Sequence, residues 1–199
     1  MKIKSIPLLL LCTVVMLLVA CGDTGPSATP DLEARSTPLH VPTPTPIILC
    51  APASYCVSKG QTYLDTDAAK AMEYFDEAIR LDPNDAGAYP SRGLAYATLG
   101  QYEKAIEDLT EAIRLNPNAF IYGSRGLAHA TLGQYEKAIE DYTEAIRLDP
   151  NFAHFYFVRG LVYADLGQYE KALQDYHEAI RLDPGNEVAI KNRNLIISN

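Results

Sequence analysis

The chain repeats itself with a period of about 34 residues, and this repetition limits the folds that are open to it. Each period ends in a short Leu-Asp/Asn-Pro-Asn/Gly string, whose prolines are Pro83, Pro117, Pro150 and Pro184. Successive prolines are therefore 34, 33 and 34 residues apart. A period near 34 predicts stacked helix–turn–helix units, each of which buries its apolar face only against its neighbours.

The residues between two of these prolines have the pattern of two helices. A first helix is expected from about Ala88 to Leu99, because Gly100 accepts the left-handed conformation common at helix C-termini. A second helix is expected from about Tyr102 to Leu115, where apolar residues recur three and four apart along one face. Pro117 ends it. Each period is thus one helical hairpin.

The places of the large and small side chains resemble those of tetratricopeptide repeats. In residues 86–118 the family's pattern is held by Tyr89, Gly93, Tyr96, Ala105, Leu109, Ala112 and Pro117. The next unit holds the same places with Tyr122, Gly126, His129, Ala138, Tyr142, Ala145 and Pro150. The last unit has Tyr156, Gly160, Tyr163, Ala172, Tyr176, Ala179 and Pro184. An earlier, degenerate unit has Cys56, Gly60, Tyr63, Ala71, Phe75, Ala78 and Pro83.

This resemblance implies an all-α fold, a right-handed superhelical solenoid of four helix–turn–helix repeats. The repeats are expected at residues 50–85, 86–118, 119–152 and 153–185, with residues 186–199 as a C-terminal capping helix. Two departures from the pattern are expected to change the structure locally. The first unit has Leu64-Asp65-Thr66-Asp67 in place of the Leu-Gly-Gln turn, and the spacing of 33 indicates a deletion near residues 119–122.

The first 20 residues have the layout of a secretory signal peptide. A basic start is followed by an apolar run from about Leu8 to Val19, which is short for a bilayer span of about 20 residues. The string Leu18-Val19-Ala20-Cys21 resembles the lipobox of bacterial lipoproteins, which implies cleavage before Cys21 and a lipid on that cysteine. The alternative is an ordinary secretory signal with an incidental cysteine. The expected location is the extracytoplasmic face of a bacterial membrane, with inner or outer membrane left open.

Residues 21–49 have the composition of a linker, and the charge of the chain argues against a nucleic-acid partner. The linker is rich in Pro and Thr, as in Pro42-Thr43-Pro44-Thr45-Pro46, and is expected to be a disordered, extended spacer. The formal net charge is −8. Removal of residues 1–20 takes away Lys2 and Lys4 and leaves 15 − 25 = −10. Phosphate binding requires the opposite sign.

The sequence predicts no enzyme and no cofactor. Charged clusters such as Glu103-Lys104 and Glu107-Asp108 recur as Glu136-Lys137 and Glu140-Asp141, which favours exposed helical faces, since a catalytic pair occurs once. The chain has no Ser–His–Asp order, glycine-rich phosphate loop or His-Glu-x-x-His string. We therefore expect no small-molecule substrate.

Two cysteines stand at the entry to the first repeat. Cys50 and Cys56 are six residues apart and are expected to form a disulfide in an oxidising location. Alternatively, both are free thiols, and Cys56 is a buried substitute for an aromatic residue. A metal site requires more ligands than these two, and the four histidines lack ligand spacing with them.

In the tetratricopeptide family, the first helices of the repeats line a concave groove that holds partner peptides. The resemblance places nine residues in this groove: Leu94, Thr98, Phe120, Leu127, Thr131, His154, Phe157, Leu161 and Asp165. Their apolar side chains could equally pack against a neighbouring helix. The Lys and Asn residues with which some relatives grip a C-terminal carboxylate are missing from these places.

A recurring arginine precedes the small glycine of each unit, at Arg92, Arg125 and Arg159, with Lys59 in the first unit. These residues either form a basic ladder that contacts acidic groups on a partner or pair with acidic neighbours inside each repeat. The expected function is a membrane-anchored scaffold that binds an unidentified protein or peptide through its groove. The alternatives are a self-associating structural module and a small-ligand-binding lipoprotein.

Overall fold

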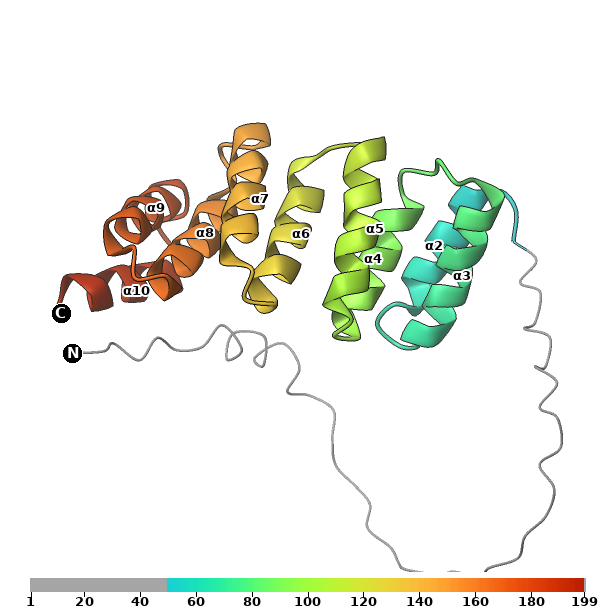
Figure 1. Ribbon diagram of the computed structural model, residues 1–199, viewed down its shortest axis with the longest axis horizontal. Helices are drawn as coiled ribbons and strands as arrows, with labels where there is room; N and C mark the ends of the chain where they lie inside the picture. The colour runs from blue at the N-terminus through green and yellow to red at the C-terminus, as the bar shows by residue number, and fades with distance from the viewer. Residues whose placement is uncertain (1–49, 199) are drawn as a thin grey trace, which may run out of the picture.

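The computed structural model describes residues 50–198, and every regular element in this range is an α-helix (Figure 1). The helices form four antiparallel pairs followed by a single helix. The pairs are α2 (Ala53–Tyr63) with α3 (Ala68–Leu81), α4 (Ala88–Thr98) with α5 (Tyr102–Leu115), α6 (Ala119–Thr131) with α7 (Tyr135–Leu148), and α8 (Ala153–Asp165) with α9 (Tyr169–Leu182). The last helix is α10 (Glu187–Ile197). The predicted all-α solenoid is confirmed, whereas the predicted signal peptide, Cys21 and the linker lie outside the described residues.

The helix pairs follow one another along the stack in sequence order, from α2 and α3 at one end to α10 at the other (Figure 1). Each second helix packs on its own first helix and on the first helix of the next repeat. The small residues of the family pattern allow the close approach within a pair. A Cβ atom added at Gly93 would lie 3.1 Å from Cγ of Leu109, and Ala105 and Ala112 are fully buried beside it.

Glycine turns join the two helices of the last three pairs. Gly100, Gly133 and Gly167 each have φ of 72°, a conformation that side chains with a Cβ rarely adopt. In the first of these turns the Gln101 N–H donates to the Tyr96 carbonyl at 2.9 Å. The first pair uses residues 64–67 instead, and the Asp67 side chain caps α3 by accepting from the Lys70 N–H at 3.0 Å. An N-cap therefore replaces the glycine turn in the degenerate unit.

The deletion between the second and third repeats falls in their connecting loop. Residues 116–118 join α5 to α6, whereas residues 149–152 join α7 to α8. The Asn118 side chain accepts from the Ile121 N–H at 3.1 Å and so starts α6 without a longer loop. α5 still packs on α6, so the stack continues across the short connection.

The two ends of the described stack differ. At the start, Cys50 and Cys56 form a disulfide with their Cα atoms 5.5 Å apart, and both are buried in a cluster that includes Val57 and Phe75. At the other end, α10 begins one residue later than expected, because the Asn186 side chain caps it by accepting from the Ala189 N–H at 2.9 Å. Within residues 50–198, no helix has both the length and the apolar composition to cross a lipid bilayer.

Candidate functional site

The first helices of successive repeats form a continuous face, which we call the first-helix face. α4 contacts both α2 and α6 in addition to its own second helix. Residues separated by one period therefore occupy matching places along this face. One such row contains Leu94, Leu127, Leu161 and Leu195, which we call the leucine row.

Two members of the leucine row expose a large part of their apolar side chains to solvent. Leu94 and Leu127 are 47% and 45% exposed, although both lie in the middle of well-packed helices. Phe120, in the first turn of α6, is 60% exposed. All three were among the residues predicted to line the groove. Contiguous exposed apolar side chains of this size are typical of interaction surfaces.

A shallow hollow of about 240 Å³ lies on this face between the first turns of α4 and α6. We call it the groove hollow, and its lining consists of Pro90, Ser91, Leu94, Leu109, Phe120, Ile121 and Ser124. This set contains no charged side chain. Of these seven residues, the sequence analysis named Leu94 and Phe120 and missed the other five. The family pattern gives the position of a residue within its repeat, but it does not predict which gap between neighbouring helices stays open.

The two serines of the groove hollow are already engaged with their own helices. Ser91 Oγ donates to the Gly87 carbonyl at 2.8 Å, and Ser124 Oγ donates to the Phe120 carbonyl at 2.8 Å. Ser91 Oγ also accepts from the Gln61 side-chain amide at 3.2 Å. The lining thus offers a ligand an apolar surface with few hydrogen-bonding groups left to use.

Phe120 belongs to a group of rings at the junction of the third and fourth repeats, which we call the aromatic cluster: Phe120, Phe152, His154 and Phe155. The centroid of Phe120 lies 5.3 Å from that of Phe152 and 5.9 Å from that of Phe155, and both contacts are edge-to-face. Phe152 and Phe155 are 4.7 Å apart, and the His154 ring meets Phe152 edge-on at 6.1 Å. Such contacts hold the exposed Phe120 ring in one orientation.

The remaining predicted groove residues have mixed environments. Thr98 is exposed and Thr131 is half-buried, and their hydroxyls donate to the Ala95 and Leu127 carbonyls. His154 is exposed, and partial desolvation of its ring lowers its pKa. Leu161 is half-buried against the core beside α9. Asp165 is also half-buried, and this burial raises the pKa of its carboxyl group.

Phe157 was predicted to line the groove, and this placement is wrong. Its side chain is only 4% exposed and packs in a core cluster with Tyr176, whose ring centroid is 6.2 Å away, and with Ala189 of α10. The residue lies on the side of α8 that faces the next two helices. Helical spacing alone does not separate the groove side of a first helix from the side that packs against a neighbouring helix.

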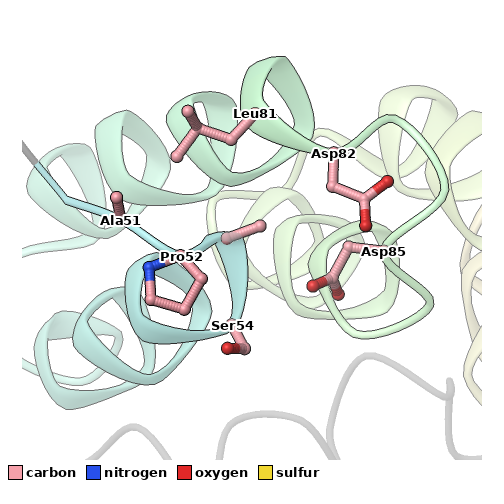
Figure 2. Close-up of a pocket in the computed structure, with 7 residues that line it drawn as sticks. Ala51, Pro52, Ser54, Leu81, Asp82 and Asp85 are labelled. Atoms are coloured by element: carbon pink, nitrogen blue, oxygen red, sulfur yellow. The ribbon is translucent and has the colours of Figure 1, made fainter.

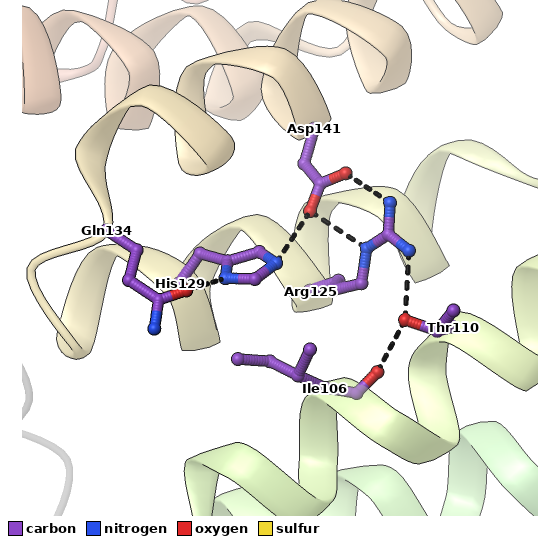
Figure 3. A network of polar contacts seen from close by, with 6 residues as sticks. All are labelled: Ile106, Thr110, Arg125, His129, Gln134 and Asp141. Carbon is purple, nitrogen blue, oxygen red and sulfur yellow. Dashed lines mark hydrogen bonds and ion pairs between the residues drawn. The ribbon is translucent and has the colours of Figure 1, made fainter.

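The recurring arginines face inward, which settles the choice between a basic ladder and internal pairs. Arg125 donates to both carboxylate oxygens of Asp141, from Nε at 3.0 Å and from Nη2 at 2.7 Å (Figure 3). The same two-pronged pair joins Arg92 to Asp108 and Arg159 to Asp175. Hydrogen bonding to Asp108 raises the pKa of Arg92 above its ordinary value. The arginines therefore connect the two helices of each repeat and are not available to a partner.

The recurring acidic clusters were predicted to lie mostly on exposed faces, and one aspartate of each cluster is an exception. Asp108, Asp141 and Asp175 are only 6%, 4% and 4% exposed. Each lies 16 residues after its arginine, and the helix–turn–helix geometry brings the two side chains together. Burial of the carboxylates is tolerable because each accepts two charge-assisted hydrogen bonds.

Each arginine also contacts the preceding repeat through its third nitrogen. Arg125 Nη1 donates to Thr110 Oγ1 at 3.0 Å, and that hydroxyl donates in turn to the Ile106 carbonyl at 2.7 Å (Figure 3). Arg159 meets Thr143 in the same way at 2.9 Å, whereas Arg92 meets Asp76 at 2.7 Å. Each arginine thus joins the two helices of its own repeat and also joins that repeat to the preceding one. We call this arrangement the arginine clamp.

The first repeat lacks this clamp. Tyr74 stands where the later repeats have the paired aspartate, and its ring stacks on that of Tyr63 with 5.6 Å between the ring centroids. Lys59, predicted as the first member of the series, lies instead with its Nζ 5.6 Å from the centre of the Tyr55 ring. The series therefore has three members within the described residues.

A second hollow, of about 380 Å³, lies where the chain enters α2 (Figure 2). Its lining includes Pro52 and Leu81 together with two carboxylates, Asp82 and Asp85. Asp82 accepts from the Asn84 N–H at 2.9 Å, and Asp85 accepts from the Gly87 N–H at 2.8 Å. Both carboxylates therefore order the loop before α4. Across residues 50–198, no group of three His, Cys, Asp or Glu side chains is arranged to hold a metal ion.

Comparison with known families agrees with this geometry. Residues 65–124 and residues 124–187 each match a family model described as a tetratricopeptide repeat. Together these matches run from residue 65 to residue 187, so the chain belongs to the tetratricopeptide repeat family. α2 of the degenerate first unit lies before the matched residues.

Solved structures of repeat proteins superpose on the chain. The crystal structure of MamA is 27% identical, with a TM-score of 0.67 over 71% of this chain and 82% of that one. MamA from Desulfovibrio magneticus RS-1 is 25% identical, with a TM-score of 0.68 over 72% of this chain and 82% of that one. YrrB, described as a TPR protein with an unusual peptide-binding site, has a TM-score of 0.66 over 74% of this chain and 77% of that one. Its identity of 23% shows the fold alone.

The curated relatives share only a short segment with the chain. Anaphase-promoting complex subunit 3 of Schizosaccharomyces pombe is 30% identical over 47% of this chain and 16% of its own length. A UDP-N-acetylglucosamine–peptide N-acetylglucosaminyltransferase of Giardia intestinalis is 37% identical over 27% of this chain and 4% of its own length. The protein named translocon at the outer membrane of chloroplasts 64, from Pisum sativum, is 45% identical over 27% of this chain and 9% of its own length. The chain thus spans less than a fifth of each of these relatives.

Proposed function

We propose that this protein is a lipid-anchored scaffold that binds a protein or peptide partner on its first-helix face, at the extracytoplasmic side of a bacterial membrane. The observation that carries the binding half is the exposed leucine row beside the groove hollow. Leu94 and Leu127 occupy matching places in successive repeats and are 47% and 45% exposed, although the second helices of the same repeats carry charged outer faces. A surface of this kind gains free energy when a partner covers it.

The partner-binding half is tested by capture from a membrane extract under mild crosslinking. Leu127→Glu places a charge in the centre of the first-helix face and should abolish capture of the partner. Leu148→Glu is the matched control, because Leu148 is a 38% exposed leucine at the end of a second helix, away from this face. Equal capture by the wild type and both variants would sink the proposal.

The anchoring half rests on the sequence of residues 1–21, which precede the described part of the chain. Cys21→Ser removes the acceptor of the lipid and should move the protein from the membrane fraction to the soluble fraction. Cys12→Ser changes a cysteine inside the apolar run and should leave the distribution unchanged. Retention of the Cys21→Ser protein in membranes would mean that residues 6–20 themselves act as the anchor.

Self-association is a second candidate, because α10 exposes large apolar side chains at the end of the described stack. Val188, Leu195 and Ile197 are 44%, 45% and 62% exposed. A copy that covered this helix would bury all three. Sedimentation velocity at tens of micromolar distinguishes this candidate from the first: a monomer removes self-association, whereas a dimer that Ile197→Glu dissociates supports it.

A further inference from the structure

The residues that line the groove hollow indicate which kind of peptide fits there. We propose that the groove hollow binds an uncharged, proline-rich segment of a partner protein in the extended polyproline conformation. The proposal rests on the proposed function, since it names the kind of peptide that the first-helix face takes. It follows from the charge, the hydrogen bonding, the aromatic content and the size of the groove hollow.

Charge excludes strongly ionic peptides. The seven lining residues contain no charged side chain, so neither an acidic nor a basic peptide finds a counterion there. Arg92 and Arg125, the cations nearest in sequence to the lining, are held by Asp108 and Asp141. A charge brought into the groove hollow would lose hydration without gaining a partner.

Hydrogen bonding favours a peptide with few backbone N–H groups. The helical carbonyls of Gly87 and Phe120 already accept from Ser91 and Ser124, and Ser91 Oγ accepts from Gln61. An ordinary peptide pressed into this lining would leave N–H groups unpaired, at a cost of about 1–3 kcal/mol for each buried donor. Proline has no backbone N–H, so a segment with proline at alternate positions halves the number of donors that need acceptors.

Phe120 is the aromatic member of the lining of the groove hollow, and it supplies a surface for a proline ring. Phe120 is 60% exposed, and edge-to-face contacts with Phe152 and Phe155 fix the direction of its ring. Phe152 stands at the N-cap of α8, where Asp67, Asn118 and Asn186 cap other helices of this chain, and it makes no capping bond. At this position α8 therefore has, in place of a capping side chain, an aromatic ring that contacts Phe120. An exposed, fixed aromatic ring is the kind of surface on which the proline rings of a polyproline helix pack.

Size favours an extended segment over a helix. An α-helix with its side chains is about 10–12 Å across. The groove hollow is a shallow space of about 240 Å³ between two neighbouring helices, α4 and α6. A partner helix would rest above it and leave it unfilled, whereas consecutive rings of an extended peptide can enter it.

The test measures binding of a fluorescent, capped peptide of five Pro-Thr pairs by the full chain carrying Cys21→Ser, using fluorescence anisotropy. A peptide with alanine in place of every proline is the matched ligand control. We expect the proline peptide to bind at least about tenfold more tightly than the alanine peptide, which corresponds to about 1.4 kcal/mol. Equal affinities for the two peptides would overturn the proposal.

Variants locate the binding to the groove hollow. Phe120→Ala should weaken binding of the proline peptide at least about tenfold, whereas Phe120→Tyr keeps the ring and should bind as the wild type does. Val188→Ala is the control, because Val188 holds the same place in α10 and is also exposed. Circular dichroism establishes that each variant is folded. Binding unaffected by a folded Phe120→Ala variant would place the peptide elsewhere and refute the inference.

Deletion of residues 37–46 identifies the source of the segment, since the chain itself contains Pro42-Thr43-Pro44-Thr45-Pro46. An unchanged affinity for the free peptide supports a partner as the occupant. An affinity that rises severalfold would show that the chain's own segment competes, and a partner would no longer be the occupant. If the peptide fails to bind but Leu127→Glu still abolishes partner capture, only this inference falls. If both fail, the proposed function falls with it.

Discussion

Three buried ion pairs dominate the structure at the scale of single residues. Each aspartate loses its hydration when the two helices of its repeat close, and the bidentate arginine compensates for that loss. Asp141 also lies near His129, whose Nε2 is 3.9 Å from its Oδ2. A buried arginine–aspartate pair is a weak source of net stability, but removal of one partner is costly because the other charge stays buried. The pairs therefore specify how the two helices of a repeat align.

Arg125→Leu should lower the free energy of unfolding by about 3–5 kcal/mol, because it removes the bidentate arginine partner of buried Asp141 and the contact with Thr110. Urea unfolding followed by circular dichroism measures the change. Arg193→Leu is the matched control: Arg193 holds the same place in α10 but donates only to exposed Asn194, so its loss should cost less than about 0.5 kcal/mol. Similar losses for the two variants would show that the buried pair is not the cause.

Asp165 is a half-buried carboxyl group of α8 whose ionisation opposes folding. Burial raises the pKa of its carboxyl group, so the native state binds the proton more tightly than the unfolded state does. Its contribution to stability is therefore present below the unfolded pKa, near the ordinary value of 3.8, and is lost as the pH rises through the raised folded pKa. At pH 7 the carboxylate destabilises the native state.

Asp165→Thr installs the residue found at the same place in the two preceding repeats, Thr98 and Thr131. The variant should have a higher Tm than the wild type at pH 7, and the difference should shrink as the pH falls toward 4. Differential scanning calorimetry at several pH values gives this trend. A Tm difference that is independent of pH would contradict the assignment of the effect to the carboxyl group.

At the scale of helices, α8 departs from the other first helices by starting at an aromatic residue. Phe152→Asn should restore an N-cap, which contributes about 1 kcal/mol. The same substitution removes a half-buried ring from its contact with Phe155 at 4.7 Å, and loss of a buried aromatic side chain costs about 3 kcal/mol or more. We therefore expect a net loss of roughly 2 kcal/mol in chemical denaturation. A stabilised variant would mean that the ring contributes little to packing.

The sequence predicts helix boundaries well where local chemistry determines them. Gly100 and Pro117 confine the helix from Tyr102 to Leu115, and the structure has these same bounds. The capping helix was predicted to begin one residue early, at Asn186. An asparagine can be either the first residue of a helix or its N-cap, and here it is the N-cap. Both boundaries depend on residues close together in the chain, so they can be predicted from the sequence.

Long-range placement was predicted less well. The burial of Asp141 depends on a pairing 16 residues away, and the burial of Phe157 depends on α9 and α10. Neither can be deduced from the period of the sequence, which fixes spacing along a helix but not the angle at which two helices cross. The open groove hollow and the aromatic cluster were missed for the same reason, since both form between repeats.

At the scale of the whole molecule, each repeat contacts only its neighbours, so the stability of the stack is a sum of repeat and interface terms. The last interface is formed by α10, which buries Ala189 and covers Phe157 and Tyr176 of the fourth repeat. Deletion of residues 187–199 would expose this core cluster to water. The third and fourth repeats would still be joined by the Arg159–Thr143 contact.

This deletion should lower the stability of the fourth repeat by about 2–4 kcal/mol, the order of losing the packing around one large buried side chain. Hydrogen exchange resolves the effect by position: amides of α8 and α9 should exchange faster, while those of α2 to α5 should stay as protected as in the full chain. Ile197→Glu is the control, because it changes an exposed residue of α10 and leaves the interface in place. Faster exchange throughout the stack would instead show that the repeats unfold as one cooperative unit, so that the ends and the groove are coupled.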